Sequence, residues 1–391
     1  ADPIEEEEWD TGKDTGEPID EPTPMVDVYE RNYEFLDLEV SQVDVAFLLD
    51  TTSSMGMTAE SLADEFGEIV DDLAASISDG AYGFATFDDY NYEGMGVDSD
   101  RPFILRQQMT TDQMLVQDAL DAIEIHNGSD APESTIEALF QGLTGIGYDQ
   151  LGDGVFDPAT DVHPFLAGPD DAFAGSAMGT FDESIPGTGV EGGYGFRDGS
   201  LPVIVYATDN ALRDADDSSF GLPPEAGFTA GSSDVMESAT DLSARLIGVA
   251  TNETPVDQMT ILAEGTNSMY AADPDGANDD PLVFVWGGSS EEFRNTIVEA
   301  IEGMLGSVTF ETVTAVVTGN TYGFDTDVEP ASYSNVTVGA APVSLNFAVE
   351  VSGAVPASTI DQTFPMNLEI YGDGVTLLAT RDVTVVVPAS L

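Results

Sequence analysis

The strongest constraint on this fold is an alternation of short apolar runs with segments of helical periodicity, which extends from residue 43 to residue 306. The run VDVAFLLD at 43–50 is almost continuously apolar, as in a parallel strand buried on both faces. In the next segment Leu62, Phe66 and Ile69 recur at the spacing of one helix face. Strands that alternate with helices predict a doubly wound α/β domain with a mostly parallel sheet.

The remaining elements of this domain follow from the same two patterns. Runs typical of buried strands occur at 81–87, 201–209, 244–251 and 282–286. Helical periodicity predicts helices at 59–78, 110–123, 132–146, 254–265 and 290–305. Together these segments account for most of an α/β domain at 43–306.

Besides residues 28–42, where FLDLEVSQ alternates like a strand, three segments lie outside the alternation. Residues 307–391 contain short alternating runs separated by Gly, Pro, Asn and Asp, which predict an antiparallel β-sandwich. Residues 1–27 are acidic and rich in Pro, Gly and Thr, so we expect a disordered tail. Residues 149–193 are rich in Gly and Asp and interrupt the α/β pattern, and insertions of this length are usually functional or disordered.

Charge and composition exclude several classes of partner. The 391 residues include 74 Asp and Glu but only 9 Lys and Arg, for a net charge of −65. Nucleic acid and anionic membranes are therefore poor partners, because the protein would repel them. The chain has no cysteine, which excludes a disulfide framework, and no apolar run long enough to predict a membrane span.

The strand at 43–50 ends in an unusual set of oxygen-bearing side chains. Asp50, Thr52 and Ser54 alternate in the turn that follows it. Open α/β sheets bind ligands at the carboxyl ends of their strands, and magnesium prefers oxygen ligands. The alternative is that these residues, with Thr58, cap the helix that follows.

Two further acidic features favour a metal site over helix capping as the role of these residues. Asp209 also ends a predicted buried strand. The sequence SDAPE places Asp130 and Glu133 just before a predicted helix, where a proline-stiffened loop can present both carboxylates. These side chains are expected to lie at the same edge of the sheet.

The motif DTTSSM resembles the metal-ion-dependent adhesion site of von Willebrand factor A domains. Together with GSDAPE and GFRDGSLPVIVYATD, it is most similar to the I-like domain of integrin β subunits. In that family the domain is inserted into a hybrid domain. The resemblance therefore implies that 28–42 and 307–391 form one β-sandwich into which 43–306 is inserted.

The resemblance also implies the ligands of the adhesion site. Asp50, Thr52, Ser54 and Glu133 would hold Mg²⁺ or Mn²⁺, and Asp209 would support the ion directly or through water. One coordination position would remain open for a carboxylate of a partner.

A neighbouring calcium site is implied as well. Its ligands would be Asp89, Asp130, the carbonyl oxygen of Pro132 and Glu133, which would bridge the two ions. The chain departs from the family at Gly128, where integrins carry an asparagine ligand.

A third metal site of that family is not expected here. Met57 and Thr58 occupy the positions of its acidic residues. The cysteine-rich modules of animal integrins are missing too, so we expect a prokaryotic or divergent relative that is extracellular or at the cell surface.

Two functions fit these features. The first is metal-dependent adhesion or ligand binding, in which the ion binds an acidic group of a protein or surface partner. The alternative is a structural or assembly component of a cell envelope or filament, whose metal stabilises the fold. An enzyme is not expected, because Ser53 and Ser54 lack a His and Asp arrangement that would make a nucleophile.

Two other groups of residues were considered as metal sites. The insertion carries Asp149, Asp153, Asp157 and Asp161, which either bind calcium or form a solvated acidic loop; they lack the EF-hand spacing. The only histidines, His126 and His163, have no cysteine partner, so a zinc site is not expected.

Overall fold

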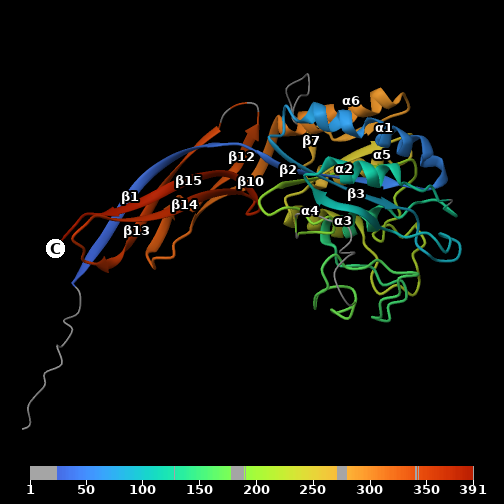
Figure 1. Cartoon of the computed structure of the whole chain (residues 1–391). Coiled ribbons are helices and arrows are strands. Elements are labelled where there is room, and N and C mark those ends of the chain that lie inside the picture. The colour runs from blue at the N-terminus through green and yellow to red at the C-terminus, as the bar shows by residue number, and fades with distance from the viewer. Residues whose placement is uncertain are drawn as a thin grey trace, which may run out of the picture.

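The computed structural model describes residues 24–126, 128–177, 189, 191–270, 280–339, 341 and 343–390. Most of the predicted tail at 1–27 lies outside this part of the chain. Figure 1 shows a lobe of helices around a sheet beside an elongated lobe made of strands. No helix among the described residues is long and apolar enough to cross a membrane.

The first lobe contains a six-stranded sheet in the order β4-β3-β2-β5-β6-β9. All neighbouring strands are parallel except the edge strand β4, which is antiparallel to β3. Its strands are β2 (Gln42–Asp50), β3 (Asp79–Phe87), β4 (Ile104–Thr110), β5 (Leu201–Thr208), β6 (Arg245–Ala250) and β9 (Val283–Val285). The strand order reverses at β2, which is where ligands bind in such sheets.

Helices cover both faces of this sheet. They are α1 (Gly56–Leu73), α2 (Gln113–Asp121), α3 (Thr135–Thr144), α4 (Ser232–Asp241), α5 (Val256–Gly265) and α6 (Ser290–Leu305). Val45 and Phe47 of β2 pack in the core with α1, α2 and α6, whereas Ala46 and Leu48 pack with α3, α4 and α5. Burial on both faces explains the continuous apolar run.

The structure differs from the predicted elements at several points. β4 was not predicted, because polar side chains such as Arg106 and Gln108 interrupt its sequence. α4 was missed because Val235 and Ala239 are its only buried residues. α1 begins and ends earlier than the predicted 59–78, and the backbone turns back after it.

The second lobe consists of two antiparallel sheets, β1-β13-β11 and β12-β10-β14-β15. Its strands are β1 (Met25–Leu38), β10 (Ser307–Thr318), β11 (Asp325–Glu329), β12 (Ser332–Gly339), β13 (Val343–Pro356), β14 (Gln362–Gly372) and β15 (Thr376–Val387). A separate short pair joins β7 (Met269–Tyr270) to β8 (Asp280–Pro281).

Segments from both ends of the chain share the first of these sheets. β1 pairs with β13 along its whole length, from Met25 opposite Pro356 to Leu38 opposite Val343, and Figure 1 shows it running beside the late strands. The predicted tail boundary at residue 27 is therefore too late. Residues 25–27 are strand because their backbone pairs with β13.

The described part of the insertion is held together by its own aspartates. The Asp149 carboxylate accepts hydrogen bonds from the N–H groups of Leu151, Gly152 and Gly154. Asp161 likewise accepts from backbone N–H groups of this loop, and both side chains are buried. Backbone donors bind the carboxylates of Asp149 and Asp161, so these two side chains stabilise the loop from within.

Candidate metal centre

The centre lies where three parallel strands end together. Asp50 is the last residue of β2 and is in register with Phe87, the last residue of β3. On the other side, Leu49 pairs with Ala207 of β5. This register brings the residues after β3 and β5 to the end of β2, as expected for parallel strands.

The turn after β2 orients its hydroxyl groups through Asp50. Asp50 Oδ1 accepts hydrogen bonds from the backbone N–H and the hydroxyl of Thr52, at 2.8 and 2.7 Å. Its Oδ2 accepts from the hydroxyl of Thr208, at 2.7 Å. Ser54 follows in a 3₁₀ turn, η1 (Ser53–Met55), and is exposed.

The alternative of a helix cap is wrong for this turn. Thr52 precedes η1 and Met55 precedes α1, and neither makes a side-chain capping hydrogen bond. Thr58 lies inside α1 and is buried. The Thr52 hydroxyl instead contacts the carboxylate of Asp50.

Backbone hydrogen bonds place Glu133 beside this turn. Its N–H donates to the carbonyl of Ala211 at 3.0 Å, and its carbonyl accepts from the N–H of Arg213 at 2.8 Å. This short parallel bridge joins the loop before α3 to the loop after β5. Asn210 Nδ2 donates to Glu133 Oε1 at 3.4 Å.

Several carboxylate oxygens at this edge are buried without a hydrogen-bond donor. They are both oxygens of Asp89, Oε2 of Glu133 and Oδ1 of Asp209. Buried polar atoms almost always have a partner, so each such atom needs an explanation. A cation bound at the first predicted site would explain the unpartnered oxygens of Glu133 and Asp209.

The carboxyl pKa values report the same crowding of negative charge. Burial raises the pKa of Asp50 to about 7, that of Asp89 to about 8 and that of Glu133 to about 10. Negative neighbours add to the effect of burial: Asp50 and Asp89 both raise the pKa of Glu133. Without a cation, such a group of acids binds protons more tightly than usual.

The donor set at the first predicted site fits a hard divalent cation. The hydroxyls of Thr52 and Ser54 follow directly after Asp50, and the backbone bridge places Glu133 and the loop beginning at Asp209 nearby. All these donors are oxygens, which suit Mg²⁺, Mn²⁺ or Ca²⁺.

The residues at the second predicted site already surround a positive side chain. Arg213 is almost fully buried, and its Nη2 donates to Asp130 Oδ1 and to the carbonyl oxygen of Pro132, both at 2.8 Å. The same nitrogen lies 3.9 Å from Asp89 Oδ1. With the guanidinium in this position, the predicted calcium ligands do not fit a calcium ion. Sequence reasoning missed this role of Arg213, because no local motif marks it.

Gly128, where the chain departs from the integrin pattern, lies against the first site. Its backbone is left-handed, with φ of 58°. A Cβ added there would lie 3.1 Å from Thr52 Cγ2 and 3.9 Å from Asp89 Oδ2. Glycine thus allows this loop to approach the hydroxyl turn closely.

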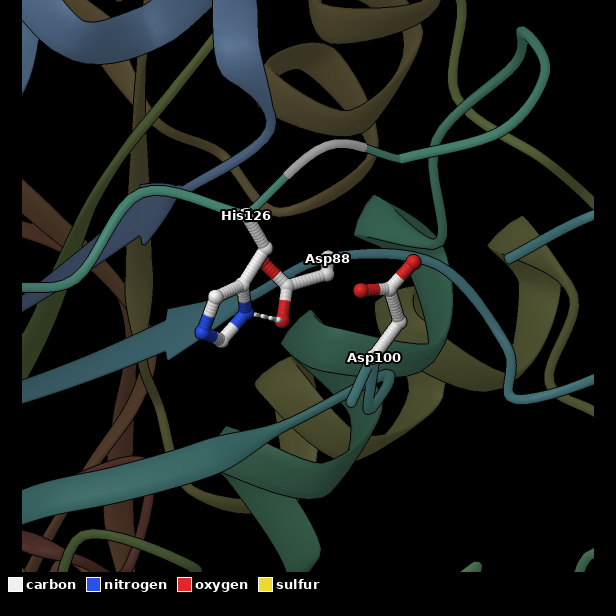
Figure 2. Close-up of side chains that lie close together, drawn as sticks. All are labelled: Asp88, Asp100 and His126. Atoms are coloured by element: carbon white, nitrogen blue, oxygen red, sulfur yellow. Dashed lines mark hydrogen bonds and ion pairs between the residues drawn. The ribbon is translucent and has the colours of Figure 1, made fainter. Parts of the chain in front are cut away.

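A third acidic group beside the site was not predicted. Asp88, Asp100 and His126 place one ligand atom each within 4.8 Å of one another (Figure 2). His126 Nδ1 lies 2.8 Å from Asp88 Oδ2, and the Thr51 hydroxyl donates to Asp88 Oδ1 at 2.6 Å. Asp100 accepts from the N–H of Val97. The position of Asp88 directly after β3 is a signal that sequence reasoning could have used.

These three residues could hold a metal ion, but their carboxylates have protein donors. That distinguishes Asp88 and Asp100 from Glu133, whose Oε2 is buried without a donor. The contacts of Asp88 join the end of β3 to the Thr51 hydroxyl and to the loop of His126. We therefore assign to Asp88 the role of tying these segments together beneath the first site.

Comparisons with known proteins add little beyond the geometry. No protein-family profile matches the chain, and no curated protein matches its sequence. The ArnB paralog VWA2 from Sulfolobus acidocaldarius aligns with a TM-score of 0.33 at 12% identity, covering 94% of this chain and 72% of that one. Proximal thread matrix protein 1 from the mussel byssus aligns with a TM-score of 0.34 at 12% identity, covering 72% of this chain and 51% of that one.

Scores at this level do not establish a shared fold. The strand order and the helices on both faces show an α/β fold with a mostly parallel sheet. The DTTSSM turn lies at the end of β2 in the middle of that sheet.

Proposed function

We propose that this protein is a metal-dependent adhesion or ligand-binding protein, which binds an acidic group of a partner through Mg²⁺ or Mn²⁺. Thr52, Ser54, Asp50 and Glu133 would hold the ion, with Asp209 in support. The ion supplies a Lewis-acidic position for an incoming carboxylate. The protein residues hold it at the edge of the sheet, next to the exposed Ser54.

The observation that carries this proposal is the pair of buried carboxylate oxygens without donors on Glu133 and Asp209. They lie at the strand ends where the sheet order reverses, together with two hydroxyl residues in one turn. Hydroxyl ligands carry no charge, so an ion held by them keeps more of its attraction for a carboxylate. Direct contact with the ion acts at short range, whereas repulsion from the distant charges of the protein is screened beyond about 8 Å at physiological ionic strength.

The finer architecture belongs to the same proposal. We take 28–42 and 307–391 as one β-sandwich of hybrid type and 43–306 as an inserted domain similar to the integrin I-like domain. The pairing of β1 with β13 supports this arrangement, because it brings the two flanking segments into one sheet. A partner is then expected outside the cell or at its surface.

The test uses peptides on a surface, because the natural partner is not identified. Binding of the protein to peptides with one Asp is compared with binding to the same peptides with Asn, in Mn²⁺ and in chelator. We expect binding only to the Asp peptides and only with Mn²⁺, and loss of binding in Ser54→Ala. Equal binding to Asp and Asn peptides would contradict the proposal.

One observation favours the alternative of a metal that only stabilises the fold. Asp50, Asp89 and Glu133 crowd one buried region, and a cation there would relieve their repulsion. In that case chelation would unfold the protein and no carboxylate would be bound. Circular dichroism in chelator, measured beside the peptide assay, separates the two functions.

A further inference from the structure

We infer that Arg213 supplies, as a side chain, the positive charge that a second cation would otherwise bring to this site. The centre would then hold one divalent ion and require no calcium. This inference rests on the proposed function, since it concerns the neighbour of the adhesion-site metal. It replaces the expected calcium site with a protein group.

The guanidinium contacts three of the four residues predicted to bind calcium. Nη2 donates to Asp130 Oδ1 and to the Pro132 carbonyl, and it faces Asp89 Oδ1. Calcium would need these same oxygens at about 2.3–2.6 Å. The arginine and the ion therefore exclude each other, by shared ligands and by repulsion between positive charges.

Arg213 is held in this position from several sides. Its Nη1 donates to the carbonyl of Gly221 at 2.7 Å. Its backbone N–H donates to the carbonyl of Glu133, and the preceding Leu212 exchanges two hydrogen bonds with the Gln258 side chain. A guanidinium with a fixed planar set of donors suits such a site better than a flexible ammonium group.

The position of Asp89 makes Arg213 relevant to the first site. Asp89 and Arg213 are both buried, and Arg213 Nη2 lies 3.9 Å from Asp89 Oδ1. Asp89 also lies beside the Glu133 carboxyl, which belongs to the first site. Arg213 thus places a positive charge beside Asp89 and, through its backbone N–H, positions Glu133.

The experiment asks whether removing the arginine creates a calcium site. Crystals of the wild type and of Arg213→Ala are soaked in Mn²⁺ and then in Ca²⁺, and the ions are located by anomalous scattering. We expect one ion in the wild type, beside Thr52 and Ser54. In Arg213→Ala we expect a second ion at Asp130 and the Pro132 carbonyl.

Melting temperatures provide a second readout, with Ca²⁺ compared to Mg²⁺ at equal concentration. Calcium should raise the melting temperature of Arg213→Ala more than that of the wild type, and Arg213→Ala/Asp130→Ala should lose this gain. Arg197→Ala is the matched control, because Arg197 also pairs with two aspartates, Asp44 and Asp79, away from this site. It should show no extra response to calcium.

Two outcomes would overturn the role of Arg213. One is calcium bound to Asp130 in the wild type with the arginine displaced, which is measurable even if the variant fails to fold. The other is a folded Arg213→Ala protein that gains no calcium site. The proposed function is judged separately, by whether Mn²⁺ lies beside Thr52 and Ser54.

Discussion

At the scale of single residues, the centre depends on how Asp50 divides its two oxygens. One oxygen orients Thr52 through its N–H and hydroxyl, and the other accepts from Thr208 on the neighbouring strand. Asp50 therefore fixes the conformation of the turn. Ser54 is exposed, so replacing it should change stability little, and it is the residue best suited to test metal binding.

Ser54→Ala should weaken metal binding without unfolding the protein. Loss of one hydroxyl ligand should lower Mn²⁺ affinity about 10-fold or more, which corresponds to about 1.4 kcal/mol. Because Ser54 is exposed, the stability of the metal-free protein should change by less than about 0.5 kcal/mol. Isothermal titration with Mn²⁺ and urea unfolding in chelator measure the two quantities.

Ser53→Ala is the matched control for this variant, since Ser53 is an exposed serine in the same turn. It should retain Mn²⁺ affinity within about threefold of the wild type, which is about 0.7 kcal/mol. Equal affinity in Ser54→Ala and the wild type would remove Ser54 from the proposed ligand set.

The acidic cluster predicts a pH dependence that metal should reduce. The pKa values of Asp50, Asp89 and Glu133 are raised to about 7, 8 and 10 in the folded protein. The metal-free fold thus binds protons more tightly than the unfolded chain. These three carboxyls therefore make their full contribution to the free energy of unfolding below about pH 4. That contribution is lost as the pH rises through their folded-state pKa values.

The melting temperature in chelator should therefore fall between about pH 5 and about pH 9. Excess Mg²⁺ should make this fall shallower, because the cation replaces the protons and binds better as the carboxyls ionise. Thermal unfolding across this range, with and without Mg²⁺, checks the difference. Parallel curves would mean that no metal binds these carboxyls.

At the scale of elements, close approach of loops shapes the site. Gly128 has a left-handed backbone and lies against Thr52, whereas Gly154 in the insertion has φ of 72° and open space around it. The two glycines share the same conformational requirement. They differ in their surroundings, because a Cβ added at Gly128 would contact Thr52 and a Cβ added at Gly154 would contact nothing.

Gly128→Ala should therefore lower both stability and metal affinity. A left-handed alanine costs about 1–2 kcal/mol, and its Cβ would push against Thr52. Gly154→Ala should cost a similar amount of stability and leave Mn²⁺ affinity unchanged. Urea unfolding and Mn²⁺ titration of both variants test this, and an equal loss of affinity in the two would show that strain alone explains the effect.

At the scale of the whole molecule, the charge of −65 dominates the response to solvent. Like charges repel in the compact state, and salt screens them over about 8 Å at physiological ionic strength. Few positive partners are available, since the chain has 9 Lys and Arg against 74 acids. The ion pairs of Arg197 with Asp44 and of Arg213 with Asp130 use two of them.

Stability should rise with sodium chloride from about 0.05 M to about 1 M, because screening relieves this repulsion. Melting temperatures in chelator measure the effect apart from specific metal binding. Sucrose at matched osmolality controls for general solvent effects. A flat salt curve would mean that the acids are too well solvated for their repulsion to matter.

Local sequence patterns by themselves determined much of the α/β fold. The run at 43–50 indicated a strand buried on both faces, and the helical periodicity of Leu62, Phe66 and Ile69 indicated α1. The DTTSSM turn could be proposed as a site because parallel strands end at one edge, and Glu133 could be proposed because the resemblance to integrin I-like domains implied it. β4 was missed because polar side chains interrupt its apolar pattern, and α4 was missed because it buries only two residues.

Only the tertiary structure decided what lies beside that turn. Arg213 is distant in sequence from Asp130 and Asp89, and nothing in its local sequence indicates a contact with them. The backbone bridge between Glu133 and the loop after β5 creates that contact. Residue type and spacing predict which oxygen-bearing side chains follow the strand ends. Whether a positive side chain such as Arg213 lies beside those oxygens depends on how loops that are distant in sequence pack together.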